Sequence, residues 1–105
     1  MNKYNNIKTV VDGIKFDSKR EAYYYLYYKR LQETKIISNL KLQTPIKFDI
    51  DGKHIFTYKA DFEYEDEYGH HYIDVKSPAT EKNAVFRLKK KLIEAKYKII
   101  IEIVK

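Results

Sequence analysis

The sequence contains no cysteine, only three glycines and two prolines, and no long low-complexity run. The absence of cysteine excludes disulfide bonds and thiolate metal sites, and it leaves the redox compartment undetermined. No stretch approaches the roughly 20 apolar residues of a membrane-spanning helix. Residues 1–11, MNKYNNIKTVV, lack the apolar segment of a signal peptide. These absences predict a cytoplasmic protein without a membrane partner.

Several familiar motifs are also missing. There is no glycine-rich phosphate loop, no G-x-S-x-G turn and no paired Cys/His finger. His70 and His71 are adjacent, so on a strand they point to opposite faces, which argues against a shared metal.

Length and charge set the general class of the protein. A chain of 105 residues, 44% hydrophobic and 34% charged, predicts one domain, residues 1–105. This length allows a hydrophobic core that needs no disulfide bonds or structural metal. Lysine and arginine outnumber the acidic residues by 21 to 15, and this net charge of +6 favours a polyanion such as DNA as partner. The 11 tyrosines are better explained by core or interface packing than by base stacking.

Turn residues and hydrophobic patterning predict an α+β fold. Asp12-Gly13 suits a type I′ turn between two short strands, and a second hairpin is expected across Asp51-Gly52. Ser18 suits the N-cap of a helix over residues 18–34, and a second helix is expected from residue 80 or 81 to residue 97. After the opening hairpin the predicted order is α-β-β-β-α-β, with one mixed sheet flanked by two helices.

The same patterning assigns residues to faces. A strand starts near Pro45 in this interpretation, and alternation in the next strand places four apolar residues on one face. The second helix has an apolar stripe facing the sheet and a lysine stripe with a seven-residue repeat. The final strand, KIIIEIVK, is apolar enough for burial on both faces. The residues assigned in this way are Tyr58, Ala60, Phe62 and Tyr64 in the strand, and Val85, Leu88, Leu92 and Ala95 in the helix.

The stretch YIDVKS, residues 72–77, places Asp74 and Lys76 on one face of a strand. If the preceding turn is centred between Glu67 and Tyr68, Asp61 lies directly opposite Asp74. Like charges in that position are destabilising. A divalent cation such as Mg²⁺, which binds one or two carboxylates together with waters and phosphate oxygens, would stabilise them.

Three further groups would complete such a site. The backbone carbonyl of Val75 could add a ligand, and Lys76 could hold the attacking water or neutralise charge on a phosphate. Glu21 could be recruited from the first helix. The alternatives stay open: D-x-K also occurs on strands with outward charges, and Ser18-x-x-Glu21 is also a capping box.

Glu21 in SKREA, Asp61 in KADFEY, and Asp74 and Lys76 in IDVKS together resemble the motif of the PD-(D/E)xK nuclease superfamily. That superfamily has a restriction-endonuclease-like α-β-β-β-α-β core. The chain is also similar over nearly its whole length to small phage-encoded members with a "YNAKK…G…FDSKxE" opening. Two positions depart from the pattern: Ala60 replaces the usual proline, and Ser77-Pro78 follows the lysine where a glycine is common.

The resemblance implies a Mg²⁺-dependent endonuclease that hydrolyses DNA phosphodiesters, with Mn²⁺ as a substitute metal. Asp61, Asp74, the Val75 carbonyl and Glu21 would bind the metal, and Lys76 would act on water or phosphate. Lys82, Arg87, Lys89 and Lys90 would contact DNA phosphates.

Holliday-junction resolvases within the superfamily suggest branched DNA as substrate, a role in phage recombination or replication, a homodimer, and the host cytoplasm as location. Two alternatives remain beside this interpretation. One is a non-catalytic DNA-binding module on the same fold, and the other is a protein-interaction domain that uses its tyrosine-rich helix.

Overall fold

A computed structural model of the protein describes residues 8–105, so residues 4–7 of the opening motif lie outside the described part. The helices and strands run as follows: β1 Thr9–Val11, β2 Ile14–Phe16, α1 Lys19–Glu33, β3 Ser38–Ile50, β4 Lys53–Asp66, β5 Gly69–Val75, α2 Pro78–Glu81, α3 Ala84–Tyr97 and β6 Ile101–Val104.

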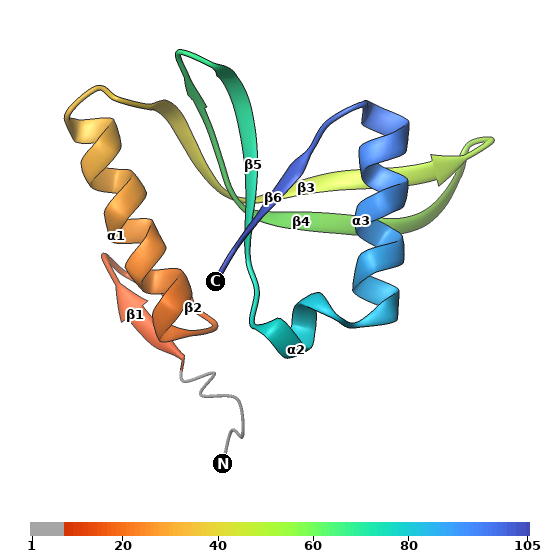
Figure 1. The fold of residues 1–105 in the computed structure, drawn as a ribbon, viewed down its shortest axis with the longest axis horizontal. Helices are drawn as coiled ribbons and strands as arrows, with labels where there is room; N and C mark the ends of the chain where they lie inside the picture. Colours follow the sequence, from red (N-terminus) through yellow and green to blue (C-terminus); the bar gives the residue numbers. More distant parts are fainter. Residues whose placement is uncertain (1–7) are drawn as a thin grey trace.

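The strands form one mixed four-stranded sheet and one small hairpin. The sheet order is β3-β4-β5-β6, with antiparallel pairing of β3 to β4 and of β4 to β5, and parallel pairing of β5 to β6. The strands β1 and β2 pair separately. Figure 1 shows α1 and α3 on opposite sides of β5 and β6. The predicted α+β class and element order are therefore confirmed.

Local sequence signals explain the first helix and both tight hairpins. The Ser18 hydroxyl caps α1 by accepting a hydrogen bond from the Glu21 N–H at 3.1 Å. In the turns, Asp12 and Gly13 have φ values of 53° and 75°, and Asp51 and Gly52 have values of 50° and 81°. Two successive positive φ values define the type I′ turn that the sequence predicts.

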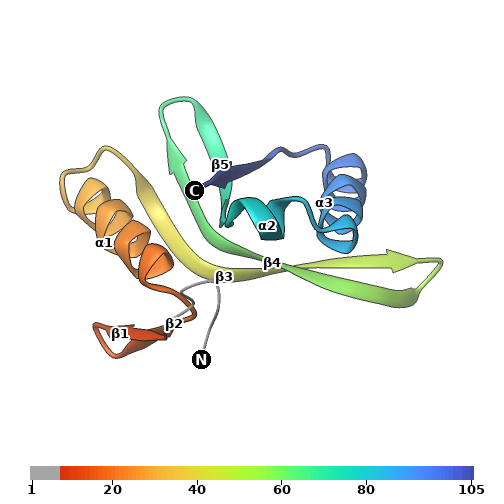
Figure 2. The same ribbon diagram turned by 60° about the horizontal axis from the view of Figure 1, so that its bottom comes forward.

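The second predicted helix is wrong as one continuous element, because the chain forms α2 and then α3. Asn83 interrupts it with an extended backbone, at φ −63° and ψ 127°, and its side chain accepts a hydrogen bond from the Phe86 N–H at 3.0 Å. Asparagine competes well for this capping position. The cap therefore restarts the helix at Ala84 and turns its axis relative to α2 (Figure 2).

The apolar stripe predicted to face the sheet is also wrong. Val85 and Leu88 are 60% and 58% exposed, whereas Ile93 is fully buried against the sheet. The change of direction at Asn83 sets which side of α3 meets the sheet, and that side carries Phe86 and Ile93. The sequence pattern could not indicate this rotation.

Two strand predictions need correction. β3 begins at Ser38, so Pro45 lies inside the strand rather than near its start. Proline is tolerated there because β3 is an edge strand of the sheet, where a missing N–H breaks no ladder. The final strand is not buried on both faces: β6 is the other edge of the sheet, and Glu102 on it is exposed.

The core is divided into two clusters on opposite faces of the sheet. Neighbouring residues of β5 belong to different clusters, since Ile73 packs with α1 and Tyr72 packs with α3. On β4, however, Ala60 belongs to the α3 cluster and Phe62 to the α1 cluster. Residues two apart normally share a face, so the alternation of β4 is interrupted at Asp61.

This interruption makes the prediction of one shared face from Tyr58 to Tyr64 wrong. The facing position on β3 shows its cause: Gln43, opposite Asp61, has φ 53°, a left-handed conformation that is uncommon for a residue other than glycine. The irregularity turns both strands together, so β3 and β4 continue as a two-stranded arm beneath α3 (Figures 1 and 2). Asp61 consequently lies at the boundary between the two clusters.

Among the helices of residues 8–105, none is both long enough and apolar enough to cross a membrane.

The packing of α3 gives a direct test of its rotation. We expect Ile93→Ala to lower the free energy of unfolding by about 2–5 kcal/mol, because it removes a buried side chain and leaves a cavity. Val85→Ala should change it by less than about 0.5 kcal/mol, because Val85 is exposed. Urea denaturation followed by circular dichroism measures both values, and a larger loss for Val85→Ala would contradict the observed orientation of α3.

Candidate active site

The register around the β4–β5 turn confirms the predicted pairing. Phe62 pairs with Ile73, and Asp66 pairs with Gly69 across the turn of Glu67 and Tyr68. Extended by one residue beyond the last of these pairs, the same register brings Asp61 opposite Asp74. The ladder of backbone pairs stops there, and side chains take over its hydrogen bonds.

Each of the two aspartates accepts a backbone hydrogen bond from the opposite strand. The Asp61 N–H donates to Asp74 Oδ1 at 3.2 Å, and the Val75 N–H donates to Asp61 Oδ2 at 2.8 Å. These bonds fix both carboxylates at the interruption in β4. The structure therefore places Val75 at the site through its N–H, and the role predicted for its carbonyl stays a prediction.

Asp74 and Lys76 lie on the same face of the sheet, as the sequence predicts. The Lys76 Nζ is 4.0 Å from Asp74 Oδ1 and 5.2 Å from the centre of the Phe86 ring. Asp74 itself is fully buried, and the Tyr58 hydroxyl donates a hydrogen bond to its Oδ2. The side chain of Lys76 remains 22% exposed, so its ammonium can reach a ligand in solvent.

Glu21 comes to the same place from the first turn of α1. The predicted capping box forms only in part, because the Glu21 carboxylate accepts from the Asp17 N–H at 3.1 Å instead of reaching the Ser18 N–H. Its second oxygen, Oε2, accepts from the Gln43 Nε2 at 3.0 Å. One oxygen of Glu21 thus supports the start of the helix while the other faces the sheet.

Gln43 connects Glu21 with Asp61. Its Nε2 donates to Glu21 Oε2 and also to Asp61 Oδ1, at 3.2 Å. Gln43 is exposed, so the acidic cluster, by which we mean Glu21, Asp61 and Asp74, is open to solvent on this side. The left-handed backbone of Gln43 aims its amide between the two carboxylates, and strained residues of this kind concentrate at functional sites.

Burial and like charge dominate the electrostatics of the acidic cluster. Burial, together with the hydrogen bonding and negative charge of Asp61, raises the pKa of Glu21 to about 7. Burial also raises the pKa of Asp74, against the opposing effects of Lys76, the Asp61 N–H and Lys90. Both shifts disfavour the carboxylate form, so a cation at this place would be stabilised.

The donor atoms suit a hard divalent cation only in combination with other ligands. In the described residues, no three carboxylate or imidazole groups are placed to hold a metal ion on their own. Mg²⁺ in proteins usually takes one or two carboxylates and completes its shell with waters and phosphate oxygens. Asp61 and Glu21, bridged by the exposed amide of Gln43, meet that requirement, and Asp74 is joined to Asp61 through the Asp61 N–H.

The residues predicted to contact DNA lie in three different places. Arg87 and Lys90 line a cavity beside α3. Lys89 instead lies with its Nζ 5.5 Å from the centre of the Phe56 ring, on the arm of β3 and β4. Lys82 is exposed at the end of α2.

Two residues of the site were missed by sequence reasoning. Gln43 in LKLQTP carries no distinguishing signal, because its importance depends on a left-handed backbone and on a helix distant in sequence. The sequence pattern places Tyr58 only on an apolar strand face; its ring is buried in the structure, and its hydroxyl donates a hydrogen bond to Asp74. A buried tyrosine usually needs a hydrogen-bond partner, and this was the available clue.

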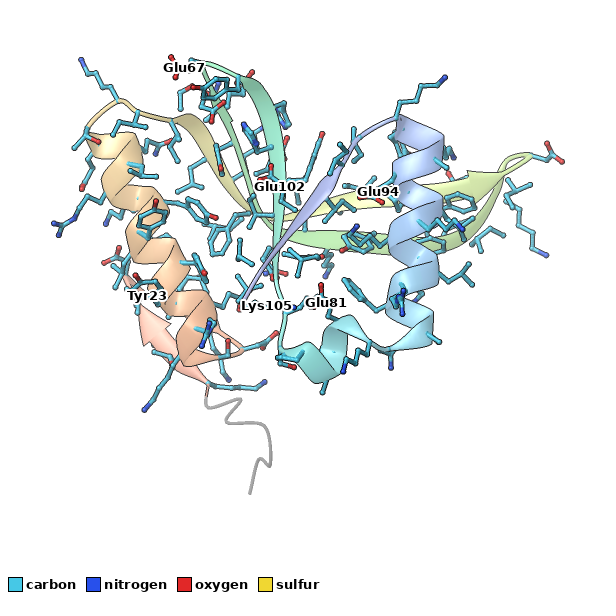
Figure 3. All side chains as sticks on the ribbon, viewed as in Figure 1. Tyr23, Glu67, Glu81, Glu94, Glu102 and Lys105 are labelled. Atoms are coloured by element: carbon cyan, nitrogen blue, oxygen red, sulfur yellow. The ribbon has the colours of Figure 1, made fainter. Side chains whose placement is uncertain are left out.

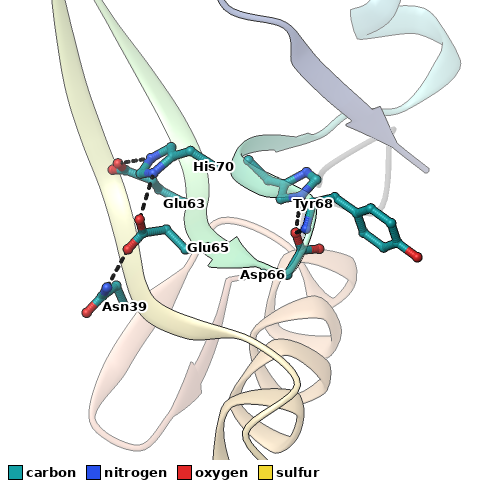
Figure 4. Close-up of polar contacts among 7 residues, drawn as sticks. Asn39, Glu63, Glu65, Asp66, Tyr68 and His70 are labelled. Carbon is teal, nitrogen blue, oxygen red and sulfur yellow. Dashed lines mark hydrogen bonds and ion pairs between the residues drawn. The ribbon is translucent and has the colours of Figure 1, made fainter.

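A second polar cluster lies near the β4–β5 turn (Figure 4). His70 contacts the buried Glu63 and lies 4.0 Å from Glu65, which is bonded in turn to Asn39. His71 has separate partners on the other face: Asp66 at 2.8 Å and Glu102 at 2.6 Å. The predicted separation of the two histidines is therefore confirmed, and their imidazoles are occupied by carboxylates.

The raised pKa of Glu21 predicts a pH-dependent stability. In the folded protein Glu21 keeps its proton up to about pH 7, whereas in the unfolded chain the carboxyl group releases its proton near its ordinary pKa of 4.5. Protonated Glu21 therefore stabilises the folded state fully below pH 4.5, and this stabilisation is lost as pH rises to 7. The free energy of unfolding should fall by up to about 3 kcal/mol over this range.

Urea denaturation in EDTA between pH 4.5 and 7.5 measures this effect in the parent and in Glu21→Gln. The variant, which cannot ionise at this position, should gain stability relative to the parent as pH rises. A difference between the two proteins that is independent of pH would contradict the assigned electrostatics.

Comparison with known proteins gives a family but no activity. A search of curated proteins and a search of solved structures each found no match. The model of the family described as "Protein of unknown function (DUF1064)" matches residues 1–104. That match covers almost the whole sequence, and the chain therefore belongs to the DUF1064 family.

Proposed function

We propose that the protein is a metal-dependent endodeoxyribonuclease of the PD-(D/E)xK type. The strongest support is that four residues from separate elements lie close together. They are Glu21 of α1, Asp61 of β4, Asp74 of β5, and Lys76, which directly follows β5. Carboxylates placed together, two of them buried, are costly without a cation, and a partly exposed lysine beside them can act on a phosphate oxygen or on a water molecule. Hydrolysis of a phosphodiester uses both.

Each residue has a role that its position supports. Asp61 and Glu21 would hold a divalent cation from the open side of the cluster, and Asp74 would support it from below. When bound, such a cation neutralises charge on the phosphate and makes a water molecule more acidic. Lys76 would donate a hydrogen bond to a phosphate oxygen or to the attacking water, because its ammonium is partly exposed beside Asp74.

Gln43 and Tyr58 would be positioning residues in this scheme. Gln43 keeps the carboxylates of Glu21 and Asp61 next to each other by donating a hydrogen bond to both. Tyr58 fixes the Asp74 side chain by donating a hydrogen bond to Asp74 Oδ2. Neither needs to touch the reacting atoms.

The substrate is proposed to be DNA, because the net charge of +6 favours a polyanion. Arg87 and Lys90 line a cavity beside α3, and Lys90 is close enough to Asp74 to oppose the rise of its pKa. The resemblance to Holliday-junction resolvases extends this proposal to branched DNA in phage recombination or replication, cut by a homodimer in the host cytoplasm.

One observation favours a second candidate, a non-catalytic DNA-binding module on the same fold. Asp74 is fully buried and its two oxygens already accept hydrogen bonds from Asp61 and Tyr58. A carboxylate in this position can be purely structural. Metal dependence of cleavage separates the two candidates.

The test is a cleavage assay on labelled linear, flapped and four-way-junction DNA with Mg²⁺, with Mn²⁺ and with EDTA. We expect cleavage with either metal and none in EDTA. Asp74→Asn, which keeps the shape of the side chain, should reduce the rate at least about 100-fold. Lys76→Ala should reduce turnover by a similar factor while DNA binding, measured by fluorescence anisotropy, changes little.

The matched control is Asp51→Asn in the exposed turn of the arm, where the αL backbone accepts asparagine. It should cleave at the parent's rate. Cleavage by Asp74→Asn as fast as by the parent would refute the assignment of the site. DNA binding that EDTA leaves unchanged, with no cleavage under any condition, would support the non-catalytic module.

A further inference from the structure

A cavity of about 480 Å³ lies between α3 and β6, which we call the α3–β6 cavity. Its volume falls within the range of roughly 300–1,000 Å³ that is typical of ligand sites. Apolar side chains line part of it, among them Phe86 and Ile103. Charged side chains line the rest.

Two of the positively charged side chains that line the cavity have no acidic partner within residues 8–105, whereas both of its acidic side chains are paired. Glu94 is paired with Lys90 at 2.9 Å and accepts from the Ile101 N–H at 2.7 Å, and Glu81 is paired with Lys105. Figure 3 shows Glu81 beside Lys105. Arg87 and Lys91, in contrast, form no ion pair with any residue of the described chain. The positive charges of Arg87 and Lys91 are therefore available to bind an anion in the cavity.

This cavity adjoins the acidic cluster directly. Ile103 is the strand neighbour of Asp74 in the parallel pair of β5 and β6. Phe86 lines the cavity and also contacts the acidic cluster, because the centre of its ring lies 5.2 Å from the Lys76 Nζ. The same ring stacks against Tyr58, whose hydroxyl donates a hydrogen bond to Asp74. A strand whose phosphate lay at Lys76 would thus place its neighbouring nucleotide at the cavity.

We propose that the α3–β6 cavity binds one nucleotide of the DNA strand next to the phosphate that is cleaved. Arg87 and Lys91 contact the phosphate of this nucleotide, and Phe86 and Ile103 contact its sugar and base. A guanidinium matches a phosphate with two parallel hydrogen bonds, and aromatic rings accept the flat face of any base. The inference rests on the proposed function, because it takes the acidic cluster as the place of cleavage.

The phosphate can belong to the end of a strand or to its interior, and the two share the same chemistry at Arg87 and Lys91. Recognition of an end would direct cleavage to a fixed distance from a 5′ terminus. Recognition of an interior phosphate would only position the strand. The experiment includes probes for both.

The test uses the full chain in EDTA at low salt, so that cleavage does not take part. Thymidine 5′-monophosphate is titrated while ¹H–¹⁵N spectra are recorded. We expect saturable shifts at Phe86, Arg87 and Ile103. Thymidine without its phosphate should bind at least tenfold more weakly, as should the nucleotide to the double variant Arg87→Gln, Lys91→Gln. The double variant Lys47→Gln, Lys53→Gln, which removes two exposed lysines of the arm, is the matched control and should bind like the parent.

Oligonucleotides with a 5′-phosphate and a 5′-hydroxyl then separate the two sources. Tighter binding of the phosphorylated strand supports a terminal phosphate, and equal binding that the double variant weakens supports an interior one. Shifts located elsewhere, or a double variant that binds like the parent, would overturn the proposal. Metal-dependent cleavage without nucleotide binding in the cavity would refute this inference alone, whereas binding without any cleavage would refute the nuclease and retain the cavity.

Discussion

The amide of Gln43 holds together two carboxylates that belong to different parts of the fold. It donates to Glu21 on α1 and to Asp61 on β4, from a backbone in the left-handed region at φ 53°. The same conformation interrupts the alternation of β3 and β4, so the core divides into clusters on opposite faces of the sheet. The acidic cluster lies at this boundary, which explains how carboxylates can be buried and yet remain open to solvent at Gln43.

Local signals were sufficient for much of the fold. The Asp-Gly turns, the Ser18 cap and the centre of the turn at Glu67 and Tyr68 were predictable because neighbouring residues determine them. From that turn the position of Asp61 opposite Asp74 followed. The class and order of the elements were predictable for the same reason, since each depends on short-range periodicity.

Long-range packing was not predictable. The restart of the helix at Asn83 rotates α3, so the apolar side chains of Val85 and Leu88 face solvent. The interruption at Asp61 depends on a strained residue in a neighbouring strand, and the hydrogen bond from Tyr58 to Asp74 depends on the resulting geometry. Tertiary contacts of this kind override strand alternation and helix periodicity. They also determine which lysines and arginines come close to the site.

The proposed function depends most on a cation held by Asp61 and Glu21, beside the Asp74 carboxylate that bonds to the Asp61 N–H. The most direct measurement is the broadening of backbone amide signals by Mn²⁺, because paramagnetic broadening depends steeply on distance from the ion. At the lowest Mn²⁺ concentrations, we expect selective loss of the Asp61 and Val75 signals, and no such loss in Asp61→Asn. Selective broadening around Glu63 and His70 instead, or uniform broadening over the whole chain, would contradict it.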